Sequence, residues 1–386
     1  MELIKTTQEL TKYCKYASKF NYIAVDTEFL REKTYFSKLC LVQLAVQSDS
    51  SNAAVVIDAL SPSIDLTVLK ELFADTGIIK VFHAARQDLE IFFQLFGSLP
   101  KPIFDTQIAA MVCGFGDQIG YDNLVKSILD KTIDKSSRFT DWSQRPLSDQ
   151  QLNYALGDVT FLRDIYEYLD NNLIDNQRST WVAEELEILT SEDTYKVNPD
   201  EMWKKIKIKS NSGKVLAILK ELASFRESYA QSQNIPRNRV LKDETILELC
   251  SVKPVNSYDL KRLRSYNFSS KSNDINEGVL RAIKQGLSRS SEDQPKKSLN
   301  QINQNKNSAL SEMLRVLLKA NSEKIGVAQK LIATTSELNQ IASGEDVEKI
   351  FKGWRYDVFG HDVLRLCEGK IGLTVSKNRI VTFDID

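Results

Sequence analysis

The first half of the chain alternates short apolar runs with turn-forming segments. Three runs rich in Val, Ile, Leu and Ala come first, at residues 22–25, 39–47 and 53–57. Runs of this kind, separated by polar turn residues, predict adjacent antiparallel strands. A helical stretch at 66–73, a strand at 78–82 and a helix from about Gln87 to Phe96 follow. Strands followed by strand–helix alternation predict an α/β sheet covered by helices.

From Asp105 onward the hydrophobic spacing is helical almost throughout. Pro146 and the Ser148-Asp149 pair predict a helix that starts near Asp149. Residues 202–286 are typical of a compact run of short helices, broken near Pro236 and Pro254. We therefore expect a first domain at 1–195 and a helical domain at 203–290.

The last quarter of the chain begins with a polar stretch. Residues 291–308 are low in hydrophobic side chains and predict a flexible linker. Residues 309–370 are helical again, and the alternation in 371–385 predicts a short hairpin around Lys377-Asn378. The third expected domain is thus 309–386.

Composition excludes several function classes. With 386 residues, 42% hydrophobic and 27% charged, the chain is typical of a water-soluble protein of two or three domains. No apolar run reaches the about 18 residues that span a bilayer, and residues 1–20 lack a signal-peptide pattern, so we expect a cytoplasmic protein with no membrane partner. Five scattered cysteines and two histidines argue against a structural zinc site, a disulfide framework and a Ser-His-Asp triad.

Charge is distributed unevenly. The net charge of the chain is −1, but residues 203–290 hold 18 Lys and Arg against 8 Asp and Glu, a net charge of +10. Cations there lie beside the aromatic residues Tyr258, Tyr266 and Phe268. This pattern favours contact with a polyanion such as RNA, although a well-solvated helical domain with an aromatic core would also explain it.

Acidic residues from three separate segments form the candidate site. Asp26 and Glu28 follow the run 22–25 and, two apart in extended chain, share one face. Asp88 lies in the first turn of the helix after the strand 78–82, while Tyr154 and Asp158 share a helical face. Oxygen ligands without His or Cys fit Mg²⁺ or Mn²⁺, and two such ions can hydrolyse a phosphodiester.

Each of these signals has a structural alternative when it is taken alone. An Asp-x-Glu at a strand end is usually a turn, and Asp88 is typical of an acid that the dipole favours at a helix N-terminus. Tyr154 and Asp158 are typical of a half-buried surface pair. Their order along the chain, together with the expected secondary structure, makes the combined pattern specific.

The same segments resemble the Exo I, II and III motifs of the DEDD exonucleases, in the tyrosine-bearing branch, and most closely ribonuclease D. The matching stretches are residues 25–29 (VDTEF), 34–36 with 39–43, 83–92, 104–110 and 141–158 (DWSQRPLSDQQLNYALGD). Residues 212–286 resemble an HRDC domain, and 310–370, with Gly353-Trp354-Arg355, resemble the second C-terminal domain of that family. The resemblance implies a ribonuclease H-like α/β exonuclease domain, a mixed sheet with flanking helices, followed by two all-α HRDC-type domains.

The resemblance also implies a role for each site residue. Asp26, Glu28 and Asp158 would bind one metal ion, and Asp26 with Asp88 a second, while Tyr154 would orient the attacking water.

Three further residues are candidates for substrate binding. Phe29 and Tyr35 would stack on the terminal bases, with core packing as the alternative for both. His83 would contact the 3′ end, with a histidine satisfied by the backbone as its alternative.

The activity implied by the resemblance is 3′→5′ exoribonuclease. Its expected substrates are structured RNA 3′ ends such as tRNA precursors, its expected products are nucleoside 5′-monophosphates, and a monomer is expected. Two rivals stay open from the residues alone. One is the same mechanism acting on DNA, and the other is a catalytically idle RNA-binding scaffold.

Overall fold

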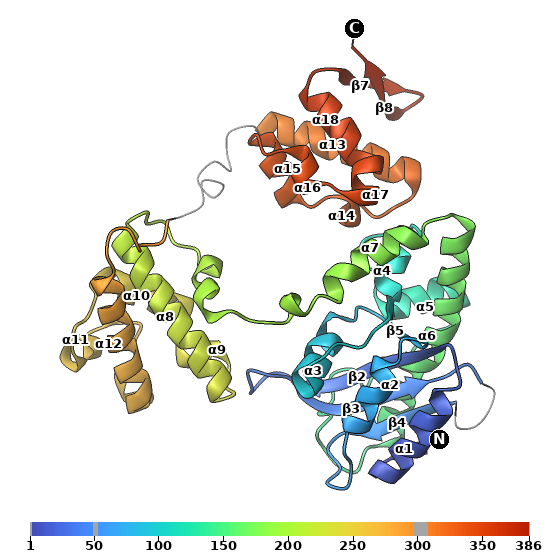
Figure 1. The fold of residues 1–386 in the computed structure, drawn as a ribbon, viewed down its shortest axis with the longest axis horizontal. Coiled ribbons are helices and arrows are strands. Elements are labelled where there is room, and N and C mark those ends of the chain that lie inside the picture. Colours follow the sequence, from blue (N-terminus) through green and yellow to red (C-terminus); the bar gives the residue numbers. More distant parts are fainter. Residues whose placement is uncertain (1, 49–52, 297–307, 386) are drawn as a thin grey trace. The chain divides into compact units, whose positions relative to one another are not determined.

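A six-stranded mixed sheet forms the centre of the N-terminal part in the computed structural model, which describes residues 2–48, 53–296 and 308–385 (Figure 1). The strands in sheet order are β1 (Glu2–Ile4), β4 (Ala54–Asp58), β3 (Lys38–Ala45), β2 (Tyr22–Leu30), β5 (Ile79–Phe82) and β6 (Ile103–Asp105). β3 and β4 pair antiparallel, whereas β1 with β4, β2 with β5 and β5 with β6 pair parallel. The mixed sheet expected from the sequence is confirmed.

Helices pack on this sheet and complete the first core. They are α1 (Thr7–Ala17), α2 (Thr67–Ala74), α3 (Arg86–Phe96), α4 (Thr106–Val112), α5 (Tyr121–Leu129), α6 (Asp149–Asp175) and α7 (Ser179–Leu189). The predicted start of α6 is confirmed, because Ser148 and Gln151 form a capping box there. One face of the 27-residue α6, including Ala155, Val159 and Leu162, is buried in the sheet's core.

Three sequence expectations need correction. The run at 22–25 is only the first part of β2, which continues to Leu30, so Asp26 and Glu28 lie within the strand rather than after it. The strands β1 and β6 were not expected, since three residues are too few to show an alternating pattern. Helix α1 was also missed, although Thr6 and Glu9 form a capping box at its start.

The second compact unit consists of residues 196–296 together with 30–38. Its helices are the 3₁₀ helices η2 (Pro199–Lys205) and η3 (Phe268–Ser270) and the α-helices α8 (Gly213–Ser232), α9 (Arg237–Val240), α10 (Asp243–Val252), α11 (Ser257–Lys261) and α12 (Asn273–Ser288). Buried aliphatic residues of α8, α10 and α12 form its core. The predicted breaks near Pro236 and Pro254 are confirmed.

The C-terminal residues 308–385 belong to the same compact unit as the sheet. They form α13 (Ser308–Ile325), α14 (Gln329–Ile332), α15 (Thr335–Ala342), α16 (Val347–Ile350), α17 (Gly353–Arg355), the π-helical turn η5 (Tyr356–Gly360) and α18 (His361–Cys367). The Trp181 ring of α7 stacks on the Trp354 ring, with centroids 4.9 Å apart, and Arg178 donates to the carbonyl oxygen of Ile325 at 2.7 Å.

A hairpin of β7 (Ile371–Ser376) and β8 (Arg379–Asp384) ends the described chain, as the sequence predicted. Lys377 and Asn378 both have positive φ angles, of 47° and 63°, which suits a two-residue hairpin turn. Most of the linker expected at 291–308 lies outside the described residues. None of the helices within the described ranges has the length and apolarity of a membrane-spanning segment.

Candidate active site

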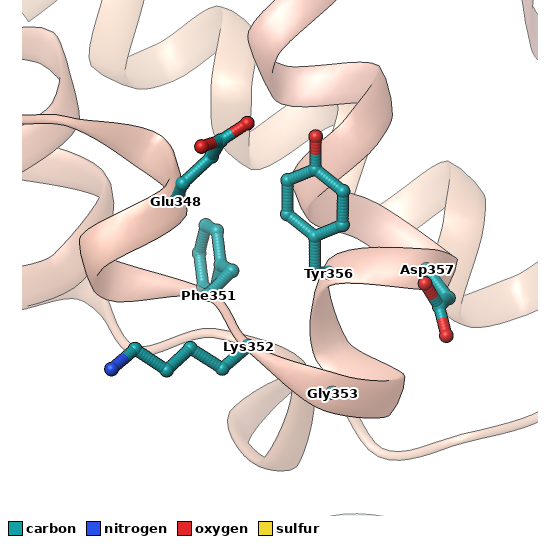
Figure 2. A pocket seen from close by; sticks show the side chains of 6 residues that line it. All are labelled: Glu348, Phe351, Lys352, Gly353, Tyr356 and Asp357. Carbon is teal, nitrogen blue, oxygen red and sulfur yellow. The ribbon is translucent and has the colours of Figure 1, made fainter.

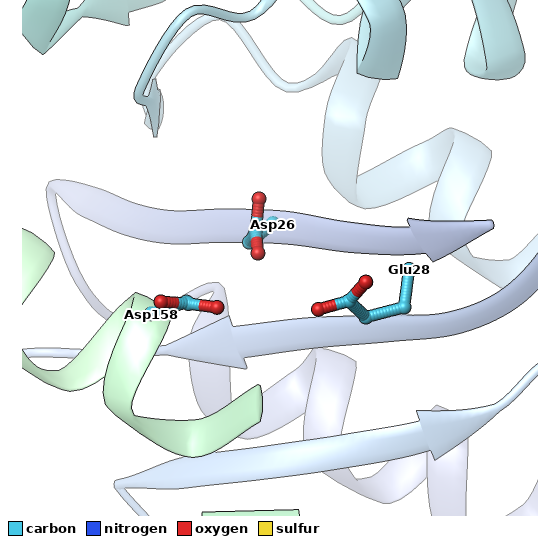
Figure 3. A group of neighbouring side chains, drawn as sticks. All are labelled: Asp26, Glu28 and Asp158. Carbon is cyan, nitrogen blue, oxygen red and sulfur yellow. The ribbon is translucent and has the colours of Figure 1, made fainter. Parts of the chain in front are cut away.

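Strand β2 and helix α6 bring three carboxylates together. Asp26 and Glu28 lie two residues apart on β2 and share one face of the strand, while Asp158 reaches them from α6 (Figure 3). One ligand oxygen of each of these three residues lies within 4.8 Å of the others. Among the described residues, this is the one group of His, Cys, Asp or Glu side chains with such spacing. The sequence prediction that these three carboxylates lie close together is confirmed.

Tyr154 lies one turn before Asp158 on the same face of α6, as the four-residue spacing predicted. Its ring packs against the buried Trp142, with centroids 5.9 Å apart, and its hydroxyl group hydrogen bonds to Asp158. The indole therefore holds the phenol ring in position beside the carboxylates.

Asp88 lies in the first turn of α3 and is buried. Its carboxylate accepts a hydrogen bond from the Thr27 hydroxyl group, so the residue between Asp26 and Glu28 fixes its position. Asp88 is not one of the three closely spaced carboxylates, but it lines the same pocket. It is therefore a buried fourth acid of the pocket, outside the closely spaced group of three.

The turn before α3 is held by the buried carboxylate of Asp105. Ala84 has a φ of 59°, which is unusual for a residue with a Cβ atom. Asp105 accepts hydrogen bonds from the amides of Ala84 at 3.1 Å and Ala85 at 2.8 Å, and also caps α4 through the Gln107 amide at 2.8 Å. The Asp105 carboxylate thus fixes the strained turn before α3, and this turn positions the Asp88 side chain.

Burial raises the pKa values of all four acids, and the charges of neighbouring acids raise those of Asp26 and Glu28 further. Burial and the charges of the three other acids raise the pKa of Asp26 well above its usual range. Burial, followed by the charges of Asp158 and Asp88, raises the pKa of Glu28 to about 9. Burial raises the pKa values of Asp88 and Asp158 to about 7. Carboxylates that repel in this way gain from a cation among them.

These acids line a pocket of about 510 Å³. The remaining walls come from β2, the turn before α3 and its first residues, the start of α5, the loop 130–148 and helix α6. A space of this size on the surface of the sheet can admit the end of a polynucleotide chain.

The residues proposed for substrate binding differ in their placement. Phe29 lines the pocket, next to Glu28. His83 also lines it, with its ring nitrogens 3.0 Å from the Thr106 hydroxyl oxygen and 3.2 Å from the Ile119 carbonyl oxygen. Burial lowers the pKa of His83, so a neutral ring with satisfied nitrogens fits the structural alternative for this residue.

Tyr35 belongs to the second compact unit. Its hydroxyl group donates to the buried carboxylate of Glu227 and accepts from Gln231 at 3.2 Å, and Arg237 lies over its ring at 5.9 Å. These contacts are those of the core-packing alternative, because the ring packs against the core of that unit.

The sequence pattern did not single out four further pocket residues. Tyr121 donates from its hydroxyl group to the Gly157 carbonyl oxygen at 3.1 Å and faces the acids at the start of α5. Lys135, Arg138 and Phe139 line the pocket from the loop 130–148. No period or spacing marks these residues. Closeness to the 141–158 motif could have drawn attention to the three loop residues, but not to Tyr121.

Two other hollows are poorer candidates for catalysis. One lies in the C-terminal residues, around Phe351, Lys352 and Tyr356, where the carboxylates of Glu348 and Asp357 point away from each other (Figure 2). The other, of about 530 Å³, lies in the second unit and is rimmed by Lys207, Lys209 and Lys253 over an apolar floor. Neither gathers acids.

The aromatic residues of the basic second unit differ in exposure, so some fit an aromatic core and others fit contact with RNA. Tyr266 is buried and belongs to the core of its unit, whereas Tyr258 is 69% exposed beneath the Arg262 guanidinium group.

The acid cluster fits a divalent cation. Three carboxylates whose ligand oxygens lie within 4.8 Å of one another, in a partly buried pocket, repel strongly unless a positive charge lies among them. Oxygen ligands favour a hard cation.

Comparisons with known proteins agree with this site. A family model described as 3′-5′ exonuclease matches residues 1–174, and an HRDC domain model matches residues 215–270. Ribonuclease D of Jannaschia sp. (strain CCS1) is 50% identical over 99% of both chains, and ribonuclease D of Nitrobacter hamburgensis is 43% identical over 99% of both.

A solved structure is also similar over nearly the whole chain. The crystal structure of Escherichia coli RNase D, described as an exoribonuclease involved in structured RNA processing, matches with a TM-score of 0.82 and 26% identity. The match covers 95% of this chain and 98% of the other. The resemblance noted in the acidic motifs is thereby confirmed: the chain belongs to the ribonuclease D family.

Proposed function

We propose that the chain is a 3′→5′ exoribonuclease that removes 3′-terminal nucleotides from structured RNA, such as tRNA precursors, and releases nucleoside 5′-monophosphates. The observation that carries the proposal is the meeting of Asp26, Glu28 and Asp158 beside Tyr154 in one pocket. The RNA preference rests on membership of the ribonuclease D family.

Two divalent cations, Mg²⁺ or Mn²⁺, would complete this site. Asp26, Glu28 and Asp158 would hold one of them, and Asp26 with Asp88 the other. When bound, such ions supply activation of the attacking water and stabilise the negative charge that develops on the phosphate. The raised pKa values of these acids support this assignment, because a cation would relieve their repulsion.

Tyr154 would position the water rather than deprotonate it. Burial and the charges of Asp158 and Glu28 raise the pKa of the phenol, so its hydroxyl group keeps its proton. A neutral hydroxyl group can donate one hydrogen bond to Asp158 and accept another from the water. The Trp142 contact keeps the phenol in that orientation.

The nearest alternative is the same chemistry on DNA, and a different class of alternative is an idle RNA-binding scaffold. The charges of neighbouring acids raise the pKa values of Asp26 and Glu28, and this repulsion speaks against the scaffold. This repulsion destabilises the folded protein. A site without catalytic activity would have no function that requires such a destabilising cluster.

The test is an assay of 5′-labelled RNA and DNA of matched sequence with Mg²⁺, with Mn²⁺ and with EDTA. We expect the labelled RNA to shorten stepwise from its 3′ end, chromatography to detect the released nucleoside 5′-monophosphates, and EDTA to stop the reaction. Asp26→Asn should lower turnover by at least about 10³-fold while RNA affinity is retained. Equal rates on DNA would favour the first alternative. No shortening with either metal would favour the second.

Several finer expectations remain part of this proposal. They are a monomeric, cytoplasmic protein, stacking of Phe29 on a terminal base, and the domain bounds 1–195, 203–290 and 309–386, with the last as a second HRDC-like domain.

A further inference from the structure

The loop 130–148 between α5 and α6 is fixed to the fold although the described chain forms no helix or strand there. Near its end, the Arg145 guanidinium group donates to Asp58 of β4 at 2.6 and 2.8 Å and to the Trp142 carbonyl oxygen at 2.8 Å. Near its middle, Ser136 accepts a hydrogen bond from Gln150 of α6 at 2.6 Å. The side chains that this loop presents to the pocket are therefore held in a defined place.

Two cations of this loop line the pocket, and they differ in their partners. The Lys135 ammonium group forms an ion pair with Asp122 at 2.5 Å. In the described part of the chain no carboxylate pairs with Arg138, whose guanidinium group lies over the Phe139 ring at 5.3 Å. Arg138 lines the same pocket as Glu28, Asp158 and Tyr154. Within the described ranges, Arg138 is thus a pocket cation that contacts an aromatic ring and forms no ion pair with a carboxylate.

The balance of charges in the pocket indicates which group Arg138 binds. On the proposed function, two divalent ions would neutralise the four carboxylates, so Arg138 is not needed to balance them and would repel the ions. The charge that remains to be matched is the single negative charge of the phosphodiester at the 3′ end. A guanidinium group is well suited to that partner, since it can donate two parallel hydrogen bonds to phosphate oxygens.

Phe139 adds an apolar surface next to this cation. Its side chain is 91% exposed, an unusual position for a phenyl ring, and it lines the same pocket. An exposed ring beside a cation is a platform on which any base can stack.

We propose that Arg138 and Phe139 together bind the 3′-terminal nucleotide, Arg138 through its phosphate and Phe139 through its base. This inference rests on the proposed function and assigns it a substrate-binding pair in the loop before α6. Arg138 is the contact to the reacting phosphate, and Phe139 is a positioning residue that holds the nucleotide against it.

The first experiment tests Arg138 with a charge-matched control. Arg138→Gln should lower kcat/KM on RNA by about 10²-fold, with Arg138→Lys in between. Lys131→Gln removes the same charge from the same loop, but Lys131 lies over Phe161 and is not part of the pocket wall, so its kcat/KM should stay within about threefold of the wild type.

Calorimetry with Mn²⁺ separates this role from a structural one. Removing a cation near the acids should leave Mn²⁺ affinity unchanged or raise it severalfold, in the direction opposite to the loss of activity. Weaker Mn²⁺ uptake by Arg138→Gln would mean that the residue builds the acid cluster, and this would overturn the proposal. A kcat/KM within about threefold of the wild type would overturn it as well.

The second experiment tests Phe139 with an RNA whose 3′-terminal nucleotide lacks its base. The wild type should cleave this substrate about 10- to 100-fold more slowly than the intact RNA. Phe139→Ala should be slow on both substrates and lose most of this discrimination, whereas Phe139→Trp should keep it. Full discrimination by Phe139→Ala would overturn the assignment.

The activity of the wild type shows whether the proposed function fails or only the roles of Arg138 and Phe139. If it degrades RNA and the variants behave as it does, only this inference fails. If it degrades neither RNA nor DNA, the proposed function fails and this inference fails with it.

Discussion

At the residue scale, the phenol of Tyr154 offers a sensitive test of the mechanism. Tyr154→Phe removes only the hydroxyl group and keeps the ring against Trp142, so the fold should be unaffected. We expect kcat to fall about 10²-fold, because the water loses its orienting hydrogen bond. Because that hydroxyl group also lowers the pKa of Asp158, the acidic limb of the pH–rate profile should move to higher pH.

Mn²⁺ affinity, measured by calorimetry, serves as the control for this variant and should stay within about threefold of the wild type. A kcat near that of the wild type would remove Tyr154 from the reaction. A parallel loss of metal affinity would instead make Tyr154 a support for Asp158.

Residue spacing in the sequence predicted the position of some site residues but not of others. Asp26 with Glu28, and Tyr154 with Asp158, are close in sequence, so the period of a strand or a helix places them on one face. Arg138 and Tyr121 reach the pocket through a loop and a helix start, where no period applies. For Tyr35 the sequence left stacking and core packing open, and its ring packs against the core of the second unit, as the second of these alternatives expects.

At the scale of elements, the turn between β5 and α3 depends on one buried carboxylate. Asp105→Ala would leave the amides of Ala84, Ala85 and Gln107 without their acceptor, in a place that water does not reach freely. We expect a loss of about 2–4 kcal/mol in the free energy of unfolding, measured with urea. We also expect a lower kcat, because the turn no longer holds the Asp88 side chain in position.

The matched control for this prediction is Asp346→Ala. Asp346 caps α16 through a single amide, that of Glu348, at 3.0 Å. Its loss should cost about 1 kcal/mol without a change in kcat. Equal losses for the two variants would show that Asp105 is an ordinary cap.

Sequence periodicity identified most of the longer strands of the sheet but not the shortest ones, and it missed helix α1. The strands β3, β4 and β5 and the start of the long helix α6 were predicted within a few residues. β1 and β6 have three residues each and are defined by pairing with β4 and β5, which no local pattern reveals. The end of β2 was missed because Asp26 and Glu28 interrupt its apolar run at the point where the site is built.

At the scale of the whole molecule, the basic second unit should contribute to RNA affinity through counterion release. Lys207, Lys209 and Lys253 rim its apolar groove. Changing all three to alanine should reduce the slope of log K against log salt by about 2, at about 0.7 for each phosphate contact on single strands. Fluorescence anisotropy with an EDTA-treated protein measures this slope without cleavage.

The control removes the same number of charges elsewhere, with Lys12, Lys319 and Lys349 changed to alanine. These side chains are exposed and line none of the hollows described above. If both triple variants change the slope equally, net charge alone governs binding and the groove has no special role.

The four acids also link the stability of the molecule to pH and metal. Their pKa values in the folded, metal-free protein lie above the unfolded values near 4, at about 7 for Asp88 and Asp158 and about 9 for Glu28. The folded state therefore holds protons that the unfolded chain has released. The sign follows: the free energy of unfolding in EDTA should fall as pH rises from about 5.5 to 9.

Other groups titrate over the same range, so the informative quantity is the difference between the wild type and Asp26→Asn, whose remaining acids repel less. Thermal unfolding in EDTA should show the wild type losing stability relative to the variant as pH rises. Mn²⁺ at about 100 times its Kd should add about 2.7 kcal/mol to the wild type at pH 8, and less at pH 5.5, where protons compete for the same oxygens. A pH-independent difference, or equal stabilisation of both proteins by Mn²⁺, would contradict the view that these carboxylates hold the metal.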